Sequence, residues 1–210
     1  VVGRIVANGD NTNTLYIQSD GEIFANSNSS SLFAYFTNVK EIENLNFLNT
    51  SQVTTMSGMF TNCRKLETID LMNFDTSNVK TMYGMFMMWN VTEDTNSIGS
   101  LRSLDLSTFD TSNVTEMSDM FAYNVSLNSI DVSNFNTSKV VNMYHMFNGC
   151  KNLLSLDLSS FDTSNVVNMY GLFSNALNLV SVKLENFNTS NTKYMQEMFY
   201  NDKNLLSLDL

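Results

Sequence analysis

Residues Leu153 to Phe173 have the sequence LLSLDLSSFDTSNVVNMYGLF, and variants of this segment make up most of the 210-residue chain. A close copy, LRSLDLSTFDTSNVTEMSDMF, spans Leu101 to Phe121. The first threonine of the shared Thr-Ser-x-Val-x-x-Met-x-x-Met-Phe pattern recurs at intervals of 26, 35, 26, 26 and 26 residues, at Thr50, Thr76, Thr111, Thr137, Thr163 and Thr189. A fixed period of this length predicts a solenoid in which each repeat forms one layer.

Each repeat has two halves with different hydrophobic patterns. Leu101 to Leu106 alternate apolar and polar residues at Leu-Asp-Leu, which is typical of a strand with one face buried. Val79, Met82, Met85 and Phe86 are spaced at i, i+3, i+6 and i+7, which predicts one face of a short helix. The preceding Asp-Thr-Ser-Asn would cap its start, and the Asn or Gly that follows would end it.

These halves predict an α/β repeat solenoid: a leucine-rich-repeat-like, right-handed stack of strand, turn and short helix with a parallel sheet. The phenylalanine that ends each copy should form a stacked column inside it. A parallel β-helix is the alternative, and the spacing of the apolar Met and Phe residues favours the form with helices.

Residues 1–30 lack the repeat and contain short strand-like segments separated by Gly and Asp turns. We expect them to form an N-terminal β-rich cap. Residues 31–210 would form the solenoid of about six 26-residue repeats, with an insertion at 87–100. The chain starts at Val1 and ends within a repeat, so we expect a fragment, truncated at the C-terminus, of a longer protein that carries the export and anchoring signals.

The charge balance narrows the classes of partner. There are 11 Lys and Arg against 21 Asp and Glu, a net charge of −10. This argues against nucleic acid and anionic membrane surfaces, and leaves cations, basic proteins and neutral glycans. No apolar run approaches the roughly 18–20 residues of a membrane helix, so no membrane insertion is expected. Cys63 and Cys150 stand three repeats apart, too far for a disulfide, and are expected to be free, buried thiols.

The first candidate site is an aspartate row at one repeat position on the outward face of the predicted sheet. Its members are Asp70, Asp105, Asp131, Asp157 and Asp209, with Lys183 in place of one aspartate. The structural interpretation is that each carboxylate accepts bonds from nearby Ser, Thr or backbone N–H groups, which would offset the repulsion between neighbours. The functional interpretation is binding of a cation or basic ligand. Calcium is the single cofactor for which this row offers ligands, and no other cofactor is expected.

The second candidate is a tyrosine row, formed by Tyr83, Tyr144 and Tyr170 at one repeat position. Tyrosine is a frequent anchor in binding surfaces. Packing between adjacent repeats is the structural interpretation of the same residues.

The third candidate is the insertion, which holds Trp89, the only tryptophan, together with Glu93 and Asp94. Insertions in solenoids form loops that are often on the binding face. A tolerated surface loop is the structural interpretation.

Catalysis is not expected. His145 is the only histidine, and no phosphate-binding glycine loop or zinc-ligand spacing is present. Carboxylates could in principle form a glycosidase pair, but these aspartates follow the repeat, whereas catalytic residues should break it.

The segments 101–121 and 153–173 quoted above resemble the 26-residue repeat of the BspA-like leucine-rich-repeat group, which is found in mycoplasmas and low-GC Gram-positive bacteria. The resemblance extends from about Ser31 to Leu210. It implies an extracellular, cell-surface-anchored protein that functions in adhesion.

We therefore expect a non-enzymatic binding module that recognises a host or matrix protein or a glycan. Residues expected to contribute are Trp89, Tyr83, Tyr144, Tyr170, Asp105, Asp131 and Asp157. The alternative is a structural spacer that displays another domain. The sequence indicates no oligomeric state.

Overall fold

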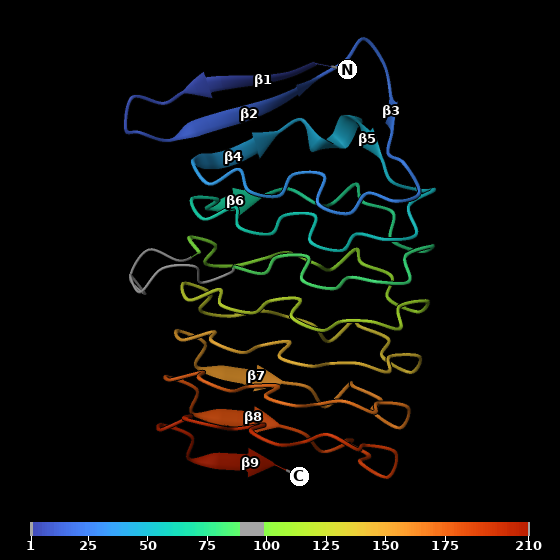
Figure 1. The fold of residues 1–210 in the computed structure, drawn as a ribbon, viewed down its shortest axis with the longest axis vertical. Helices are drawn as coiled ribbons and strands as arrows, with labels where there is room; N and C mark the ends of the chain where they lie inside the picture. The colour runs from blue at the N-terminus through green and yellow to red at the C-terminus, as the bar shows by residue number, and fades with distance from the viewer. Residues whose placement is uncertain (1, 89–98, 210) are drawn as a thin grey trace.

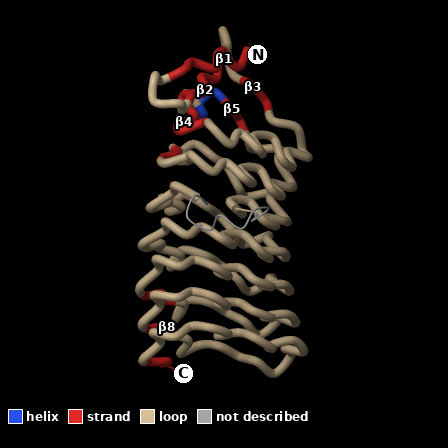
Figure 2. The backbone as a smooth tube through the Cα atoms, turned by 60° about the vertical axis from the view of Figure 1, so that its left-hand side comes forward, coloured by secondary structure: helices blue, strands red, loops and turns tan. Residues whose placement is uncertain are grey.

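The computed structural model describes residues 2–88 and 99–209 and shows an elongated stack of coils. The chain runs from one end of the stack to the other, and the termini lie at opposite ends (Figure 1). Each coil corresponds to one repeat, and successive coils lie directly against one another (Figure 2). The expected repeat solenoid is confirmed.

The N-terminal end of the stack is a sheet with the strand order β1-β2-β4-β6. Strands β1 (Val2–Ala7) and β2 (Asn13–Gln18) form an antiparallel hairpin. Strand β2 then pairs in parallel with β4 (Val39–Glu43), and β4 pairs in parallel with β6 (Thr68–Ile69). The hairpin thus covers the backbone edge of the first coil.

The remaining strands are short and parallel. Strand β3 (Ile23–Phe24) pairs with β5 (Leu48–Asn49), beside a single 3₁₀ turn at Leu45–Phe47. Strands β7 (Ser155–Asp157), β8 (Ser181–Lys183) and β9 (Ser207–Asp209) pair in sequence, with partners 26 residues apart. The expected parallel sheet is present and joins equivalent positions of successive repeats.

The prediction of short helices is wrong. We call the equivalent segments 55–60, 81–86, 116–121, 142–147, 168–173 and 194–199 the methionine segments. They form turns, and their first residues are joined from coil to coil by parallel bridges such as Thr55 to Thr81 and Thr81 to Glu116. In the described part of the chain, the 3₁₀ turn is the only helical element.

A left-handed residue in the middle of each methionine segment explains the difference. The φ angles of Gly58, Gly84 and Gly171 are 60°, 55° and 58°, and Asp119, His145 and Glu197 adopt the same region. A left-handed residue ends a right-handed helix. Alternate N–H groups then point toward the next coil: Gly58 N–H donates to the carbonyl of Tyr83 at 2.7 Å, and Phe60 N–H to that of Met85 at 2.8 Å.

The core contains the expected column of stacked phenylalanines. Neighbouring ring centroids lie 5.2 to 6.1 Å apart with interplanar angles of 3° to 18°. Each pair contributes about 0.5–1.5 kcal/mol beyond burial. The column consists of Phe33, Phe60, Phe86, Phe121, Phe147, Phe173 and Phe199.

The recurring threonines form a second ladder, made of hydrogen bonds. The buried Thr76 hydroxyl donates to the carbonyl of Asp110 in the next coil at 2.9 Å, and Thr111 donates to Asn136 at 3.0 Å. The Asp and Ser residues beside each threonine cap a turn, not a helix: the Asp75 carboxylate accepts the Ser77 N–H at 3.0 Å. These bonds satisfy the buried threonine hydroxyls and the turn N–H groups within the stack.

Candidate functional site

The aspartate row lies along the sheet face, and its carboxylates bond to their own coils. Asp105 Oδ1 accepts the N–H of Ser107 at 3.0 Å and its hydroxyl at 2.7 Å. The equivalent N–H bonds reach Asp70 from Met72, and Asp131 from Ser133. These bonds hold the pKa values of Asp105 and Asp131 below their usual range.

Lys183 adds a cation to this row. Its Nζ lies 2.8 Å from Asp157 Oδ2, the carboxylate at the paired position of the neighbouring strand, and with Ser159 it lowers the pKa of Asp157. Among the described residues, no group of three or more His, Cys, Asp or Glu side chains could hold a metal ion. The structural interpretation thus accounts for Asp70, Asp105, Asp131 and Asp157, and the predicted ligand role of this row stays a prediction.

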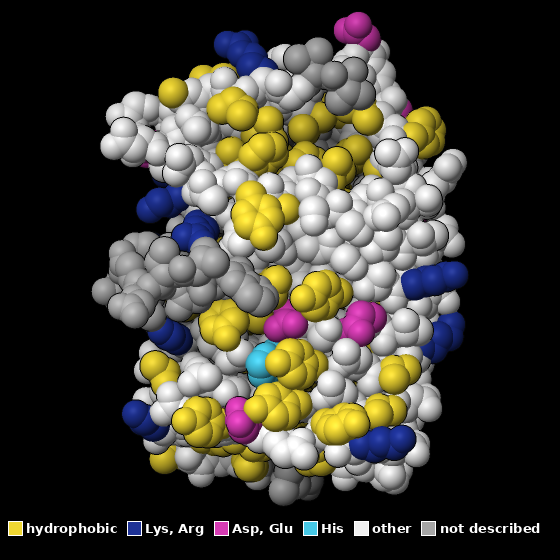
Figure 3. Space-filling view, viewed as in Figure 1, with side chains coloured by type: hydrophobic (Ala, Val, Ile, Leu, Met, Phe, Trp, Pro, Cys, Tyr) yellow, Lys and Arg dark blue, Asp and Glu magenta, His cyan; other side chains and the backbone are white. Residues whose placement is uncertain are grey.

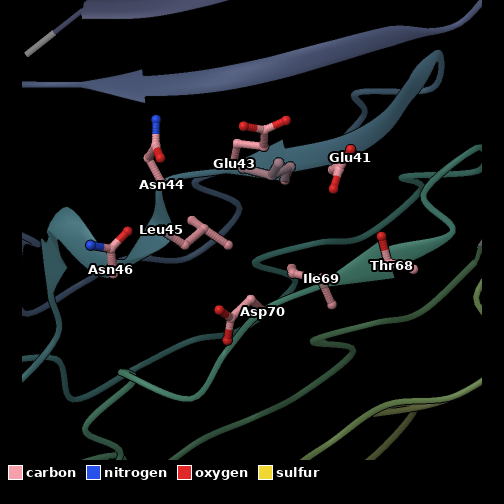
Figure 4. A pocket seen from close by; sticks show the side chains of 9 residues that line it. Glu41, Glu43, Asn44, Leu45, Asn46, Thr68, Ile69 and Asp70 are labelled. Atoms are coloured by element: carbon pink, nitrogen blue, oxygen red, sulfur yellow. The ribbon is translucent and has the colours of Figure 1, made fainter.

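A hollow of about 420 Å³ lies beside Asp70 at the N-terminal end of the sheet face. Glu43 on β4 and Asp70, just after β6, lie on its two sides, with the apolar side chains of Leu45 and Ile69 between them in Figure 4. The Glu43 carboxylate also raises the pKa of Tyr16 on the adjoining strand. Glu41 adds a third carboxylate to the lining, and none of the lining residues is Lys or Arg.

The tyrosine row lies on a different face, along the methionine segments. Tyr83 is 40% exposed, and the rings of Tyr144 and Tyr170 stack at 5.6 Å with an interplanar angle of 21°. The coil between Tyr83 and Tyr144 has the buried Ser118 at this position. Part of the row therefore packs between repeats, and part of it is open to solvent.

Two titratable groups of adjacent coils meet beside this row, at the left-handed position. Asp119 Oδ1 lies 3.8 Å from Nδ1 of His145. Asp119 keeps only 9% of its surface exposed and accepts no hydrogen bond from the described residues. Burial, helped by the nearby Glu116 charge, raises the pKa of Asp119 to about 7. Burial also lowers the pKa of His145.

A glycine in the following coil makes room for the imidazole. A Cβ atom on Gly171 would come within 2.4 Å of Cδ2 and 2.6 Å of Nε2 of His145. The imidazole also contacts the ring of Tyr144, with centroids 3.9 Å apart, and lies 5.5 Å from that of Tyr170. The side chain at one left-handed position thus fills the space that glycine leaves in the next coil.

Glu116 and Glu197 add carboxylates to the same face. Glu116 Oε1 accepts the N–H of Ser118 at 2.8 Å, and Oε2 accepts Nδ2 of Asn142 at 3.0 Å. The Glu197 carboxylate next to the Tyr170 hydroxyl raises the pKa of Tyr170. In Figure 3, hydrophobic, acidic and histidine side chains gather in the middle of this face, while Lys and Arg lie mainly toward its sides.

The sequence prediction included the tyrosines of this surface but not Glu116 or Asp119, and it considered His145 only as a catalytic residue. The usable signal was a departure from the repeat: Asp119 and His145 occupy the position that is glycine in three other copies, at Gly58, Gly84 and Gly171. Trp89 and most of the insertion lie outside the described residues.

The two cysteines are free and buried, as expected. Burial raises the pKa of each thiol to about 12. The thiol of Cys63 donates to the carbonyl of Phe33, and that of Cys150 to the carbonyl of Phe121, so both stabilise the stack.

Comparison with known proteins gives one family and several similar solved structures, two of which are leucine-rich proteins. A leucine-rich repeat protein from Bacteroides ovatus is 14% identical, with a TM-score of 0.39 over 99% of this chain and 70% of that chain. A leucine-rich cell surface protein from Faecalibacterium prausnitzii is 14% identical, with a TM-score of 0.25 over 98% of this chain and 52% of that chain. No curated protein matches the chain.

The family profile described as "Mycoplasma protein of unknown function, DUF285" matches residues 28–98 and 88–208. These two matches cover nearly all of the repeats, in agreement with the resemblance to mycoplasma and BspA-like sequences. The chain therefore belongs to the DUF285 family of mycoplasma proteins.

Proposed function

We propose that the chain is a non-enzymatic, ligand-binding module of an extracellular, surface-anchored protein, and that it adheres to a host or matrix protein or a glycan. The tyrosine row and the carboxylates beside it would form the contact surface. The exported, anchored location rests on the resemblance of the repeats to BspA-like sequences. In the described part of the chain, no helix is both long and apolar enough to span a membrane.

The observation that carries this proposal is the contrast between polar rows that bond within their own coils and a mostly buried carboxylate that accepts no such bond. The threonine ladder and the aspartate row bond within the stack. Asp119 is mostly buried, accepts no hydrogen bond from the described residues, and lies 3.8 Å from His145 on the face that carries the exposed Tyr83. Buried polar groups that lack partners are costly, and they concentrate where a protein binds something else.

The test is binding of the purified chain to an array of matrix glycoproteins and glycans at physiological salt. The variant Tyr83→Ala with Tyr170→Ala should lose at least about tenfold in affinity, because a few aromatic anchors dominate such contacts. Tyr200→Ala is the matched control, since Tyr200 is 60% exposed and lies outside the row. Equal binding by both variants would contradict the assignment of this face.

A structural spacer is the second candidate, and the regular ladders favour it, because a spacer requires only a stiff, self-satisfied stack. A spacer should bind nothing on the array specifically. Every variant of the tyrosine row should then have an unchanged circular dichroism spectrum.

A further inference from the structure

Asp119 is the starting point, because its carboxylate is mostly buried and accepts no hydrogen bond from the described residues. Exposed aspartates such as Asp105 and Asp157 each accept an N–H and a hydroxyl from the serine two residues later. Among the described residues, the one group that forms an ion-pair contact with Asp119 is the imidazole of His145, at 3.8 Å, beyond hydrogen-bond distance. A ligand that brings donors and positive charge would therefore regain the solvation that folding removes.

The neighbours of Asp119 suit a cation. Burial, with the charges of Asp119 and Glu116, raises the pKa of Tyr83, and burial with the charge of Asp119 raises that of Tyr144. The ring of Tyr144 also contacts the imidazole that lies beside the Asp119 carboxylate, with centroids 3.9 Å apart. Aromatic faces attract cations, and burial strengthens that attraction.

The charge of the surrounding methionine segments also favours a cationic ligand. The first four residues of the methionine segments from 81 to 197 include Glu116, Asp119 and Glu197 but no Lys or Arg. Both oxygens of Glu116 already accept hydrogen bonds, so Glu116 contributes charge and leaves the open acceptor sites to Asp119. The whole chain has a net charge of −10, which would draw a basic partner toward it.

We propose that this surface, formed by Tyr83, Glu116, Asp119, Tyr144, His145 and Tyr170, binds an arginine-bearing segment of a protein partner, with a guanidinium group on Asp119. This inference rests on the proposed function and specifies the chemistry of its ligand. Guanidinium fits better than ammonium, because it is planar, is weakly hydrated and offers several donors that can bond a carboxylate while the plane stacks on a tyrosine.

The proposal sets the pH dependence of binding. The titratable groups that face Asp119 are Glu116, His145, Tyr83 and Tyr144, with Glu197 farther along the face. The pKa of Asp119 is about 7, so this group loses its charge as the pH falls from 8 to 5.5. His145 gains charge only below its ordinary pKa of 6.5, and that charge would compete with the ligand. Both changes weaken binding in acid.

The experiment is a calorimetric titration of the intact chain at pH 8 with a short peptide of alternating arginine and glycine. The same peptide with citrulline, which keeps the shape of arginine without its charge, is the ligand control. Asp119→Asn is the test variant, and it should fold, because asparagine tolerates the left-handed backbone of this position. Asp162→Asn is the protein control, since it removes the same charge from an exposed position outside both candidate rows.

The expected result is binding of the arginine peptide and not of the citrulline peptide. Asp119→Asn should weaken binding at least about tenfold, and Asp162→Asn by less than about twofold. Binding by the unchanged chain should also weaken when the pH is lowered to 5.5. Equal losses in the two variants would overturn the proposal, because they would indicate general attraction to an acidic surface.

The peptide titration and the array test the two proposals separately. If the array identifies a ligand that depends on Tyr83 and Tyr170 but the arginine peptide does not bind, the chemistry inferred here is wrong and the binding module stands. A neutral glycan on this face would be such a result. If neither the array nor the peptide gives binding, both proposals fail together.

Discussion

The two polar faces of the solenoid use aspartate in opposite ways. On the sheet face, Asp131 is exposed, accepts the N–H of Ser133 at 2.9 Å and has a lowered pKa. On the face of the methionine segments, Asp119 is mostly buried, accepts no hydrogen bond from the described residues and has a pKa raised to about 7. The comparison teaches that a carboxylate that recurs at one repeat position can be satisfied by bonds within its own coil. One that breaks the repeat can be held at a cost to stability, and such costs are frequent where a protein functions.

Removing a core side chain that both faces share should destabilise the whole solenoid. Phe121→Ala deletes a fully buried ring from the phenylalanine column that lies beneath both faces. We expect a loss of about 3–5 kcal/mol in the free energy of unfolding, measured by chemical denaturation. Phe24→Ala is the control, because Phe24 is 59% exposed, and its effect should stay within about 1 kcal/mol.

Filling the space beneath His145 should disturb only the methionine-segment face. In Gly171→Ala, the added Cβ would collide with the imidazole, and the residue would be strained at a φ of 58°. We expect a loss of about 1–3 kcal/mol in thermal or denaturant unfolding. Gly58→Ala meets its nearest atoms only at 3.2 and 3.3 Å, so it should cost less.

A double-mutant cycle isolates the collision. His145→Gly removes the imidazole, so Gly171→Ala should cost clearly less in that background than in the original chain. An unchanged cost would show that backbone strain alone, without the side-chain contact, explains the effect.

Neutralising Asp119 should stabilise the fold at pH 8. Its folded pKa of about 7 lies above the ordinary 3.8, so the folded state holds a proton that the unfolded state has released between these values. Its contribution to stability is therefore favourable in acid and is lost as the pH rises from about 4 to 7. We expect Asp119→Asn to gain about 1–3 kcal/mol at pH 8 and nothing near pH 4. A loss of stability at pH 8 would mean that Asp119 is compensated within the fold.

The smallest effect, of opposite sign, is expected on the sheet face. Asp131 has a lowered pKa, so its bond to Ser133 contributes stability above pH 3.8 that is lost as the pH falls through the folded pKa. Asp131→Asn should therefore be slightly less stable than the original chain at pH 8 and equal to it in strong acid. Denaturant unfolding at the two pH values measures this, and a gain at pH 8 would remove the contrast between the faces.

Much of the scaffold could be predicted from the repeat. The 26-residue period predicts the solenoid and the pairing of equivalent strand positions, such as Leu156 with Val182. It also predicts the stacking of equivalent phenylalanines, such as Phe147 on Phe173. These features follow from side-chain alternation and from burial in a repeated layer, which a single sequence records directly.

The predicted helices failed for a local reason. The spacing of Val79, Met82, Met85 and Phe86 suits a helix, but it also suits a tight turn that buries every third or fourth residue. Gly84 within the segment was the contrary signal, because glycine readily adopts the left-handed backbone that redirects the chain. Apolar spacing alone could not separate the two conformations.

The candidate surface was only partly predictable. The tyrosines were visible because they share a repeat position. The pairing of Asp119 with His145 depends on the left-handed backbone of both residues and on the space above Gly171. That arrangement arises between coils and is absent from the pattern within any one repeat.

The most direct test of the contrast between the faces is a carboxyl-carbon NMR titration of the intact chain, with and without the arginine–glycine peptide. We predict that Asp119 titrates near pH 7 in the free protein, that its pKa falls when the peptide is present, and that Asp131 titrates below 3.8 in both samples. An Asp119 that titrates like Asp131 and does not respond to the peptide would contradict both the contrast and the binding surface inferred from it.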